Sequence, residues 1–489
     1  MPVDLSCLEP APLWRRFAEI CAIPHPSGGE ERLAAWIEGL ASSAGLESER
    51  DAAGNLLVRK PAAPGGKRVP AVVLQSHLDM VPQKAAGKDF DFEKDPIVPV
   101  VEDGWVAAEG TTLGADNGIG VAAMLAVMEA EIPDAGPIDL LFTVKEEIGL
   151  LGAMDIDESM IKADILINLD SEDVSTVIIG CAGGRDVEFR LRPRFEKAPG
   201  DEWRFLAVSL GGLEGGHSGV DAHLRRGNAI IELAKTVFGP TVDAGGRVAA
   251  FEGGSLPNAI PRDASIVLAV PDGSDIESAL DGAACSAELR LASTDPGARF
   301  EFADTARVPE FLDSASSERL LRLLAEFPDG PFETVLEDGR EVVESSSNLG
   351  SVAMDGGEFL LRTMQRGVSD NLLDAASERV AEHALELGCE PRKGPAFPPW
   401  PPSRDSNLLK LVADVFERRA GVKPAIEIIH AGLECGVIGS KRAGMDMVSI
   451  GPTIKHPHSP KERVEIRSVD AFCRILMGII SSLGVESSS

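Results

Sequence analysis

The sequence predicts an α/β protein with a second, α+β domain inserted into it. Apolar runs at 69–75, 138–144 and 163–169 have the length and the continuous hydrophobicity of strands buried within a parallel sheet. Acidic residues or histidines follow each run, at the edge where open α/β sheets bind their ligands. From about residue 186 the pattern changes to half-exposed strands alternating with helices, which is typical of a separate antiparallel α+β segment.

The length of 489 residues also favours two domains. We expect the first domain to comprise residues 1–186 and 396–489, and the second to comprise 187–395. A proline-rich segment, 394–404, is predicted to be the linker that returns the chain to the first domain. No internal repeat is visible in the sequence.

The remaining elements follow from apolar spacing, with a period of about 3.6 residues for helices and two for strands. In chain order, the predicted helices are 13–22, 30–44, 119–131, 228–238, 276–290, 318–326, 374–387, 406–419 and 468–483. The other predicted strands are 55–59, 186–191, 205–210, 264–270, 299–303, 358–366, 425–430 and 445–450.

The composition disfavours several classes of partner. The formal net charge of −31 argues against nucleic acid and anionic membranes, and no apolar run has the length of a membrane span. The seven cysteines are scattered without CxxC spacing, which is typical of reduced thiols and disfavours thiolate metal sites. The N-terminal segment has no apolar signal core, so we expect a cytoplasmic protein.

Two adjacent glutamates, Glu146 and Glu147, follow the strand at 138–144. Adjacent residues that leave a strand point in different directions, so one carboxylate can bind a metal ion while the other faces a substrate. His77 and Asp79 follow the strand at 69–75 in the same way. A metal-bound imidazole usually donates its other N–H to a carboxylate, but this histidine is alternatively explained as the cap of a strand end.

Two aspartates also lie next to the ends of predicted elements. Asp116 precedes the helix at 119–131, in the segment GTTLGADNGIG, and Asp170 follows the strand at 163–169. Taken alone, Asp116 is better explained as the N-cap of that helix, and Asp170 equally well as a turn residue. The glycine-rich segment lacks the GxxxxGK[ST] pattern, so it is not expected to bind phosphate.

The coincidence of these residues carries the functional prediction. The ligand candidates are His77, Asp116, Glu147, Asp170 and a histidine near position 458. They supply two histidines, three carboxylates and no thiolate, a ligand set that suits catalytic zinc, cobalt or manganese. Five ligands exceed what one open site needs and suffice for two metal ions if one carboxylate bridges them. A carboxylate that binds no metal would take the proton of the activated water, and Glu146 suits that role.

Several segments occur in an order that resembles a known enzyme superfamily. They are SHLDM, GTTLGADNGIG, the strand before Glu146, NLD, GGHSG, NAIP, HAGLECG, and MVSIGPT followed by PHSP. The order resembles the co-catalytic zinc exopeptidases of the aminoacylase, carboxypeptidase and dipeptidase superfamily, over nearly the whole chain. HAGLECG and the MVSIGPT–PHSP pair narrow the resemblance to the bacterial aminoacyl-histidine dipeptidases, a subfamily also called peptidase D or cytosol non-specific dipeptidase.

The resemblance implies a mixed sheet flanked by helices, with an inserted lid and dimerisation domain, and two zinc ions per subunit of a homodimer. It implies that His77 and Asp170 hold one zinc ion and that Glu147 and His458 hold the other. Asp116 would bridge the two ions, for which cobalt or manganese could substitute.

Catalytic roles are also implied by the resemblance. Asp79 would orient His77, Glu146 would be the general base, and the peptide bond 116–117 would be cis. His217 resembles a mobile histidine of the lid that polarises the scissile carbonyl and that related dimers often supply from the other subunit.

Four further residues resemble those of a substrate pocket. Asn258 and Arg362 resemble lid residues near the C-terminal carboxylate of the substrate. His430 and Glu434 resemble residues that face the substrate termini, with roles that the sequence does not separate.

One position departs from the expected pattern. His456 lies two residues before His458, where a small residue is expected, and both imidazoles could point the same way. We assign the metal to His458 because it carries the PHSP match.

The predicted activity is metal-dependent hydrolysis of dipeptides with broad specificity, with Xaa-His dipeptides such as β-alanyl-histidine among the candidates. One alternative is hydrolysis of N-acyl amino acids, which would share the metal site and differ in the lid pocket. An alternative of another class is a non-catalytic peptide-binding protein. Such a protein would usually lose the base or a ligand, and all of these residues are present here.

Overall fold

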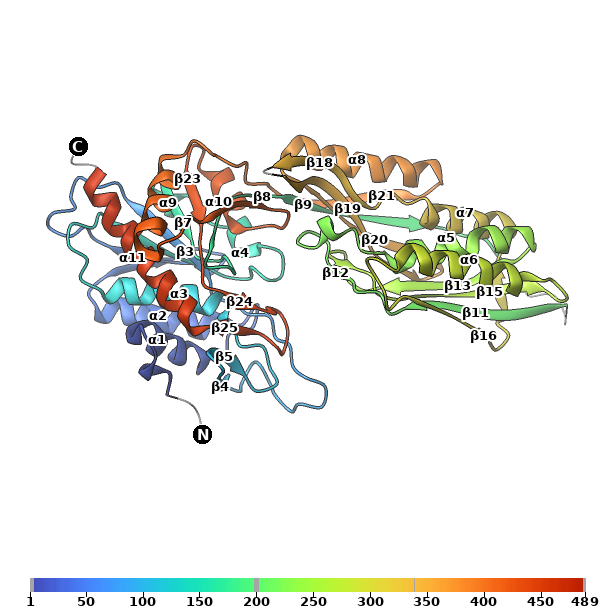
Figure 1. The fold of residues 1–489 in the computed structure, drawn as a ribbon, viewed down its shortest axis with the longest axis horizontal. Helices are drawn as coiled ribbons and strands as arrows, with labels where there is room; N and C mark the ends of the chain where they lie inside the picture. The colour runs from blue at the N-terminus through green and yellow to red at the C-terminus, as the bar shows by residue number, and fades with distance from the viewer. Residues whose placement is uncertain (1–3, 198–201, 338, 487–489) are drawn as a thin grey trace. The chain divides into compact units, whose positions relative to one another are not determined.

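The chain forms two compact units (Figure 1). A computed structural model describes residues 4–197, 202–337 and 339–486. The first unit contains Met1–Cys181, Trp400–Ile428 and Leu433–Ser489, and the second contains Ala182–Pro399 and Ile429–Gly432. The short segment 429–432, which carries His430, thus belongs to the second unit although it lies within the C-terminal part of the sequence.

The first unit is built on a mixed eight-stranded sheet in the order β1-β2-β6-β3-β7-β23-β8-β22. The strands β3, β6, β7 and β23 run parallel, whereas β2 runs antiparallel to β6. All six residues of β6 are buried, which confirms the predicted buried strand. The bounds are β1 Glu47–Arg50, β2 Leu56–Lys60, β3 Val72–His77, β6 Ile138–Thr143, β7 Ile165–Asn168, β8 Thr176–Cys181, β22 Ala425–Ile429 and β23 Asp446–Ser449.

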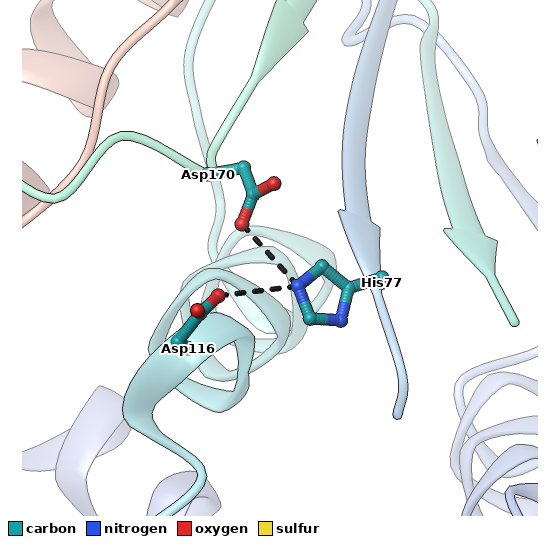
Figure 2. A group of neighbouring side chains, drawn as sticks. All are labelled: His77, Asp116 and Asp170. Carbon is teal, nitrogen blue, oxygen red and sulfur yellow. Dashed lines mark hydrogen bonds and ion pairs between the residues drawn. The ribbon is translucent and has the colours of Figure 1, made fainter. Parts of the chain in front are cut away.

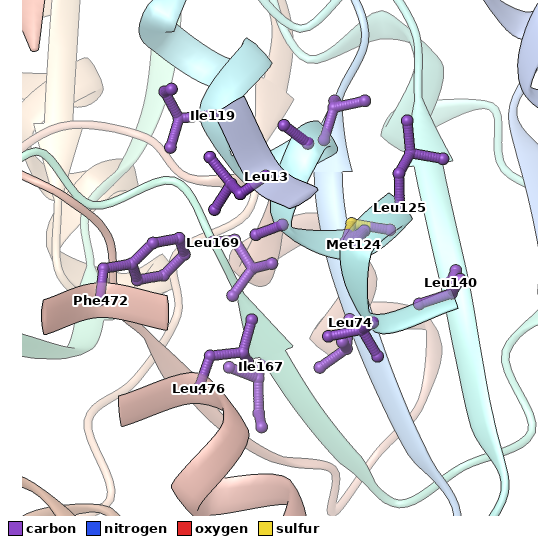
Figure 3. Packing of buried hydrophobic residues seen from close by; sticks show 14 of the residues in the cluster. Leu13, Leu74, Ile119, Met124, Leu125, Leu140, Ile167, Leu169, Phe472 and Leu476 are labelled. Carbon is purple, nitrogen blue, oxygen red and sulfur yellow. The ribbon is translucent and has the colours of Figure 1, made fainter. Parts of the chain in front are cut away.

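Helices pack on this sheet through a shared apolar core. Figure 3 shows Met124 and Leu125 of α3 close to Leu74 and Leu140 of the sheet, with Leu476 of α11 beside Ile167. Helix α3 is buried on nearly all sides, which explains its apolar composition. The helices of this unit are α1 Ala11–Cys21, α2 Glu31–Ser43, α3 Ala115–Glu129, α4 Leu151–Met154, α9 Asn407–Ala420, α10 Glu434–Lys441 and α11 Ile466–Glu486, with 3-10 turns η1 Leu5–Cys7 and η2 Glu158–Met160.

A small four-stranded sheet, β24-β25-β5-β4, completes the first unit. Its strands are only two to four residues long, too short to produce a recognisable alternation, and the sequence did not predict them. They are β4 Pro99–Glu102, β5 Trp105–Ala108, β24 Ile454–Lys455 and β25 Arg463–Glu465.

The second unit contains a topological repeat that the sequence does not show. Its main sheet has the order β16-β11-β15-β13-β19-β20-β9-β21. The chain order β11-α5-β13-β15-α6-β16 gives a β-α-β-β-α-β half with the ferredoxin-like strand order, and β9-α7-β19-β20-α8-β21 gives a second half with the same order. The first half is inserted between β9 and α7 of the second.

The two halves meet where β13 pairs with β19 through two residue pairs, Gly253 with Val352 and Gly254 with Ser351. The corresponding helices α5 and α7 pack together. The bounds are β9 Gly183–Leu191, β11 Trp203–Gly211, β13 Arg247–Gly254, β15 Ala264–Pro271, β16 Arg299–Asp304, β19 Arg340–Asp355, β20 Glu358–Gly367, β21 Glu390–Phe397, α5 Ala229–Asp243, α6 Ile276–Leu291, α7 Ser314–Ala325 and α8 Asp370–Glu386.

A further strand of the main sheet, β18 Gly330–Glu337, pairs antiparallel with β19. Short elements complete the second unit: β10 Phe195–Lys197, β12 Gly216–His217, η3 Ala222–Leu224, β14 Ala259–Ile260 and β17 Glu310–Leu312. The sequence analysis predicted neither β18 nor β19. β19 carries a run of buried serines in place of alternating apolar residues. The predicted linker at 394–404 is wrong in its first residues, since β21 continues to Phe397 and pairs with β9. Among the described residues, no helix combines the length and hydrophobicity needed to cross a membrane.

Candidate metal centre

The five predicted metal ligands lie together at one edge of the first unit's sheet. His77 ends β3, while Glu147 and Asp170 follow β6 and β7. Asp116 is the second residue of α3, and His458 lies in the loop between β24 and β25. The carboxyl ends of neighbouring parallel strands meet at the same edge, which is why residues far apart in the sequence converge.

Asp116 lies between the two histidines. Its Oδ1 is 3.2 Å from Nε2 of His77, and its Oδ2 is 3.1 Å from Nε2 of His458. His77 Nε2 also lies 3.4 Å from Asp170 Oδ1. Figure 2 shows His77 in contact with both aspartates. His458 Nε2 lies 3.0 Å from Glu147 Oε2. Each oxygen of Asp116 therefore faces one histidine–carboxylate pair.

These contacts define two groups of possible metal ligands that share Asp116. In each group, His77–Asp116–Asp170 and Asp116–Glu147–His458, the candidate ligand atoms lie within 4.8 Å of one another. The same distance also groups His77 with Glu146 and Glu147, so proximity alone does not decide which glutamate is a ligand. His456 is exposed and belongs to none of these groups among the described residues.

The residues present fit a bound cation. Within the described part of the chain, Glu147 Oε1 is buried without a hydrogen-bond partner, and a buried carboxylate oxygen in that state is satisfied when it binds a metal ion. The donor set contains imidazole nitrogen and carboxylate oxygen without thiolate, which suits zinc in a catalytic site.

Glu462, which the sequence analysis did not single out, holds the loop that carries Asp116. Its carboxylate accepts hydrogen bonds from four successive backbone N–H groups, those of residues 113–116, at 2.7, 3.0, 2.8 and 3.2 Å. Glu462 is 2% exposed and lies four residues after His458. The loop that carries His458 is thereby fixed to the loop that carries Asp116. The peptide bond 116–117 is cis, as the resemblance implied.

Asp79 contacts both His77 and the two glutamates. His77 Nδ1 lies 2.9 Å from the backbone oxygen of Asp79 and 3.5 Å from its carboxylate. The carboxylate accepts hydrogen bonds from the backbone N–H of Glu146, at 2.9 Å, and of Glu147, at 3.1 Å. In the neutral ring of His77, a proton on Nδ1 leaves Nε2 with a lone pair that can bind a metal ion placed between His77, Asp116 and Asp170.

Glu434 begins α10 and is completely buried. One of its carboxylate oxygens accepts hydrogen bonds from Gln75 Nε2, at 2.5 Å, and from Thr143 Oγ1, at 2.7 Å. Burial is the main cause that raises the pKa of Glu434 to about 8. Glu434 therefore lies among the strands β3 and β6 of the first unit.

A second polar cluster lies in the second unit, around His217. Nδ1 of His217 accepts hydrogen bonds from the backbone N–H groups of Gly219 and Val220, at 3.2 and 3.0 Å. Nη2 of Arg366, which can only donate, lies 3.3 Å from Nε2 of His217. Hydrogen-bond donors therefore face both ring nitrogens of His217. Nε2 of His430 lies 2.8 Å from the hydroxyl of Ser346. Burial, followed by the charge of Arg366, lowers the pKa of His430 to about 3.

The two predicted carboxylate-binding residues of this unit are placed differently. The backbone oxygen of Asn258 accepts a hydrogen bond from Ser218 N, which ties Asn258 to the His217 loop. Arg362 is half exposed and lies 4.0 Å from Glu188. The contact with His217 is made by Arg366, four residues further along β20. Both arginines project from the same face of the strand, and the sequence contained no signal that separated them.

Comparison with known proteins decides the family. A model of peptidase family M20/M25/M40 matches residues 73–482. The chain belongs to this family. It is 40% identical over 482 residues to cytosol non-specific dipeptidase from Escherichia coli (strain K12), covering 98% of this chain and 99% of that protein.

Solved structures agree with this assignment. The crystal structure of aminoacylhistidine dipeptidase from Vibrio alginolyticus is 37% identical, with a TM-score of 0.83 over 98% of both chains. A tripeptidase from Staphylococcus aureus shares the fold at 18% identity, with a TM-score of 0.56 over 98% of this chain and 99% of that one. The predicted α/β fold with its mixed sheet is therefore confirmed as that of the M20 peptidases.

The charges of the M20 site favour protonated histidines while no metal ion is bound. Burial by itself would lower the pKa of His77, but the charge of Asp170 and hydrogen bonds with Asp116 and Asp170 hold it well above its usual range. Burial would likewise lower the pKa of His458, but hydrogen bonds with Asp116 and Glu147 raise it to about 12. A metal ion that uses these imidazoles must therefore displace their protons.

We predict that zinc binding to metal-free protein at pH 7 releases about two protons, one from each imidazole, and that zinc affinity rises with pH. Calorimetric titrations in buffers of different ionisation enthalpy measure the proton count. The matched control is His458→Ala, which should release about one proton fewer. Zinc binding without proton release would contradict the assigned protonation states.

Proposed function

We propose that this protein is a metal-dependent dipeptidase of broad specificity that includes Xaa-His dipeptides such as β-alanyl-histidine. The observation that carries the proposal is the position of Asp116, whose two oxygens face two separate histidine–carboxylate pairs. The full-length similarity to two enzymes named as dipeptidases supports dipeptides as the substrate class.

We further propose that the site holds two zinc ions, for which cobalt or manganese could substitute. His77 and Asp170 would hold one ion and Glu147 and His458 the other, with Asp116 shared. When bound, the ions act as Lewis acids toward the scissile carbonyl and lower the pKa of the attacking water.

Glu146 is the proposed general base. Its carboxyl group is a neighbour of Glu147 and of His77, and its backbone is fixed through Asp79. Burial, followed by the charge of Glu147, raises the pKa of Glu146 well above its usual range. Positive charge nearby favours the carboxylate form, which can take the proton of the water and pass it to the leaving amine.

The second unit would supply substrate contacts, as a lid. His217 would polarise the scissile carbonyl by donating a ring N–H to its oxygen. Among the arginines of β20, Arg366 is now a stronger candidate than Arg362 for the substrate carboxylate, because it is buried and contacts His217. The roles of Asn258, His430 and Glu434 stay predictions, as does the homodimer. The cytoplasmic location is also a prediction, and the word cytosol in the name of the Escherichia coli relative supports it.

The first test is hydrolysis of Ala-Ala, β-Ala-His, Gly-Gly-Gly and N-acetyl-Met by purified protein, before and after chelation and after zinc is restored. We expect cleavage of the dipeptides only, lost with chelator and recovered with zinc. Cleavage confined to N-acetyl-Met would assign the protein to the N-acyl amino acid hydrolases. No cleavage by protein with two metal ions bound would favour the peptide-binding alternative.

The second test separates the two histidines of the C-terminal loop. His458→Ala should remove one metal ion per chain and lower kcat by a factor of about 10³ or more, because its Nε2 contacts both Asp116 and Glu147. His456→Ala is the matched control and should keep both ions and most of the activity. Metal analysis of dialysed protein together with kinetics measures both effects, and equal metal loss in the two variants would overturn the assignment.

A further inference from the structure

The turn after β6, residues 144–147, is held by side chains along its whole length. Its four successive backbone N–H groups all donate to side-chain oxygens. The first donates to Asn55 Oδ1 at 3.2 Å, the second to Glu30 Oε1 at 3.0 Å, and the last two to the Asp79 carboxylate at 2.9 and 3.1 Å. Because Glu146 and Glu147 belong to this turn, these oxygens fix the backbone from which both carboxylates project.

The turn has a conformation that needs such support. Lys145 has a φ of 56°, in the left-handed region that residues with a side chain rarely adopt. Its N–H is the group that Glu30 accepts. The carboxylate of Glu30 therefore holds the residue whose backbone turns the chain from β6 toward the two glutamates.

The burial and the second hydrogen bond of Glu30 keep its side chain in this contact. It is 4% exposed, and the same Oε1 accepts a second hydrogen bond, from Gly28 N at 2.8 Å. It directly precedes α2, yet its side chain does not cap that helix. Its buried oxygen instead joins the N-terminal loop to the turn.

Ser27 holds the same turn through Asp79. Its hydroxyl donates to Asp79 Oδ2 at 2.8 Å, on the oxygen that also accepts from Glu147 N. Its backbone N–H donates to the Met80 oxygen at 3.3 Å. Both Ser27 and Glu30 lie before residue 73, where the match to the family model begins.

We propose that Glu30 and Ser27 are positioning residues for the reaction, acting through the backbone of the 144–147 turn and through Asp79. The proposal rests on the function proposed for Glu146 and Glu147. A displacement of a reacting group by about 1 Å can lower the rate about a hundredfold, so loss of these contacts should alter turnover more than substrate binding.

The central experiment compares Glu30→Ala with Glu30→Gln. The alanine variant leaves the N–H of Lys145 without its acceptor, and we expect kcat to fall by a factor of about ten to a hundred with KM nearly unchanged. The glutamine variant keeps an Oε1 acceptor and should restore kcat. Glu31→Ala removes a neighbouring exposed carboxylate that contacts Arg50 and serves as the matched control.

A structural role alone would give a different result. The proposal is overturned if Glu30→Ala lowers Tm but keeps the wild-type kcat, or if Glu30→Gln is as impaired as Glu30→Ala. Ser27→Ala and Ser27→Thr form a second pair, which tests the same account if Glu30→Ala does not fold. Here the alanine variant should lose turnover and the threonine variant, which keeps the hydroxyl, should retain it.

Cobalt binding separates this proposal from the proposed function. Glu147 is a proposed ligand, so the visible spectrum and the affinity of bound Co²⁺ should change in Glu30→Ala and be restored in Glu30→Gln. If the wild-type protein cleaves no dipeptide, the proposed function fails, but this spectral comparison still tests the positioning. Identical spectra and affinities in all three proteins would contradict it.

Discussion

The structure depends on the contact of one aspartate with two histidines. Asp116 accepts from His77 through one oxygen and from His458 through the other, in a region where the carboxylates of Glu147 and Asp170 also converge. Burial raises the free energy of each of these charges, and their mutual repulsion adds to it. Although burial opposes it, hydrogen bonds with the two histidines hold the pKa of Asp116 below its usual range.

Hydrogen bonds between backbone N–H groups and buried side chains hold the loops that carry these ligands in place. Glu462 fixes the segment before Asp116 with four hydrogen bonds, and Asp79, Glu30 and Asn55 fix the turn that carries the two glutamates. In both places a buried side chain that is not a proposed ligand satisfies the backbone of a loop that carries one. Such outer contacts orient metal ligands and tune their affinity. The ligands therefore rest on a rigid edge of the sheet even though each of them lies in a loop or at the end of an element.

The ligand set could be predicted from the sequence because of a topological rule. A run such as 138–144 identifies a buried strand, and the carboxyl ends of parallel strands share one edge, so the residues after each run converge whatever their distance in the sequence. His458 follows no strand of that sheet. It was assigned through the PHSP match, and the structure places it beside Asp116.

Other features left no recognisable pattern in the sequence. Nothing in the sequence tells which distant N–H a carboxylate such as Glu30 or Glu462 satisfies, because that depends on how loops fold back. Arg362 and Arg366 project from one face of β20, but only Arg366 is buried and contacts His217. The two halves of the second unit share strand order but not sequence pattern, because the serine-rich β19 corresponds to the apolar, glycine-ended β13.

Anomalous diffraction at the zinc edge, from crystals of the zinc-loaded protein, tests the central claim most directly. The account predicts two peaks, one at a ligand distance of about 2.0–2.2 Å from His77 and Asp170, the other at the same distance from Glu147 and His458, with Asp116 in contact with both. A single peak, or a second ion that does not contact Asp116, would contradict it.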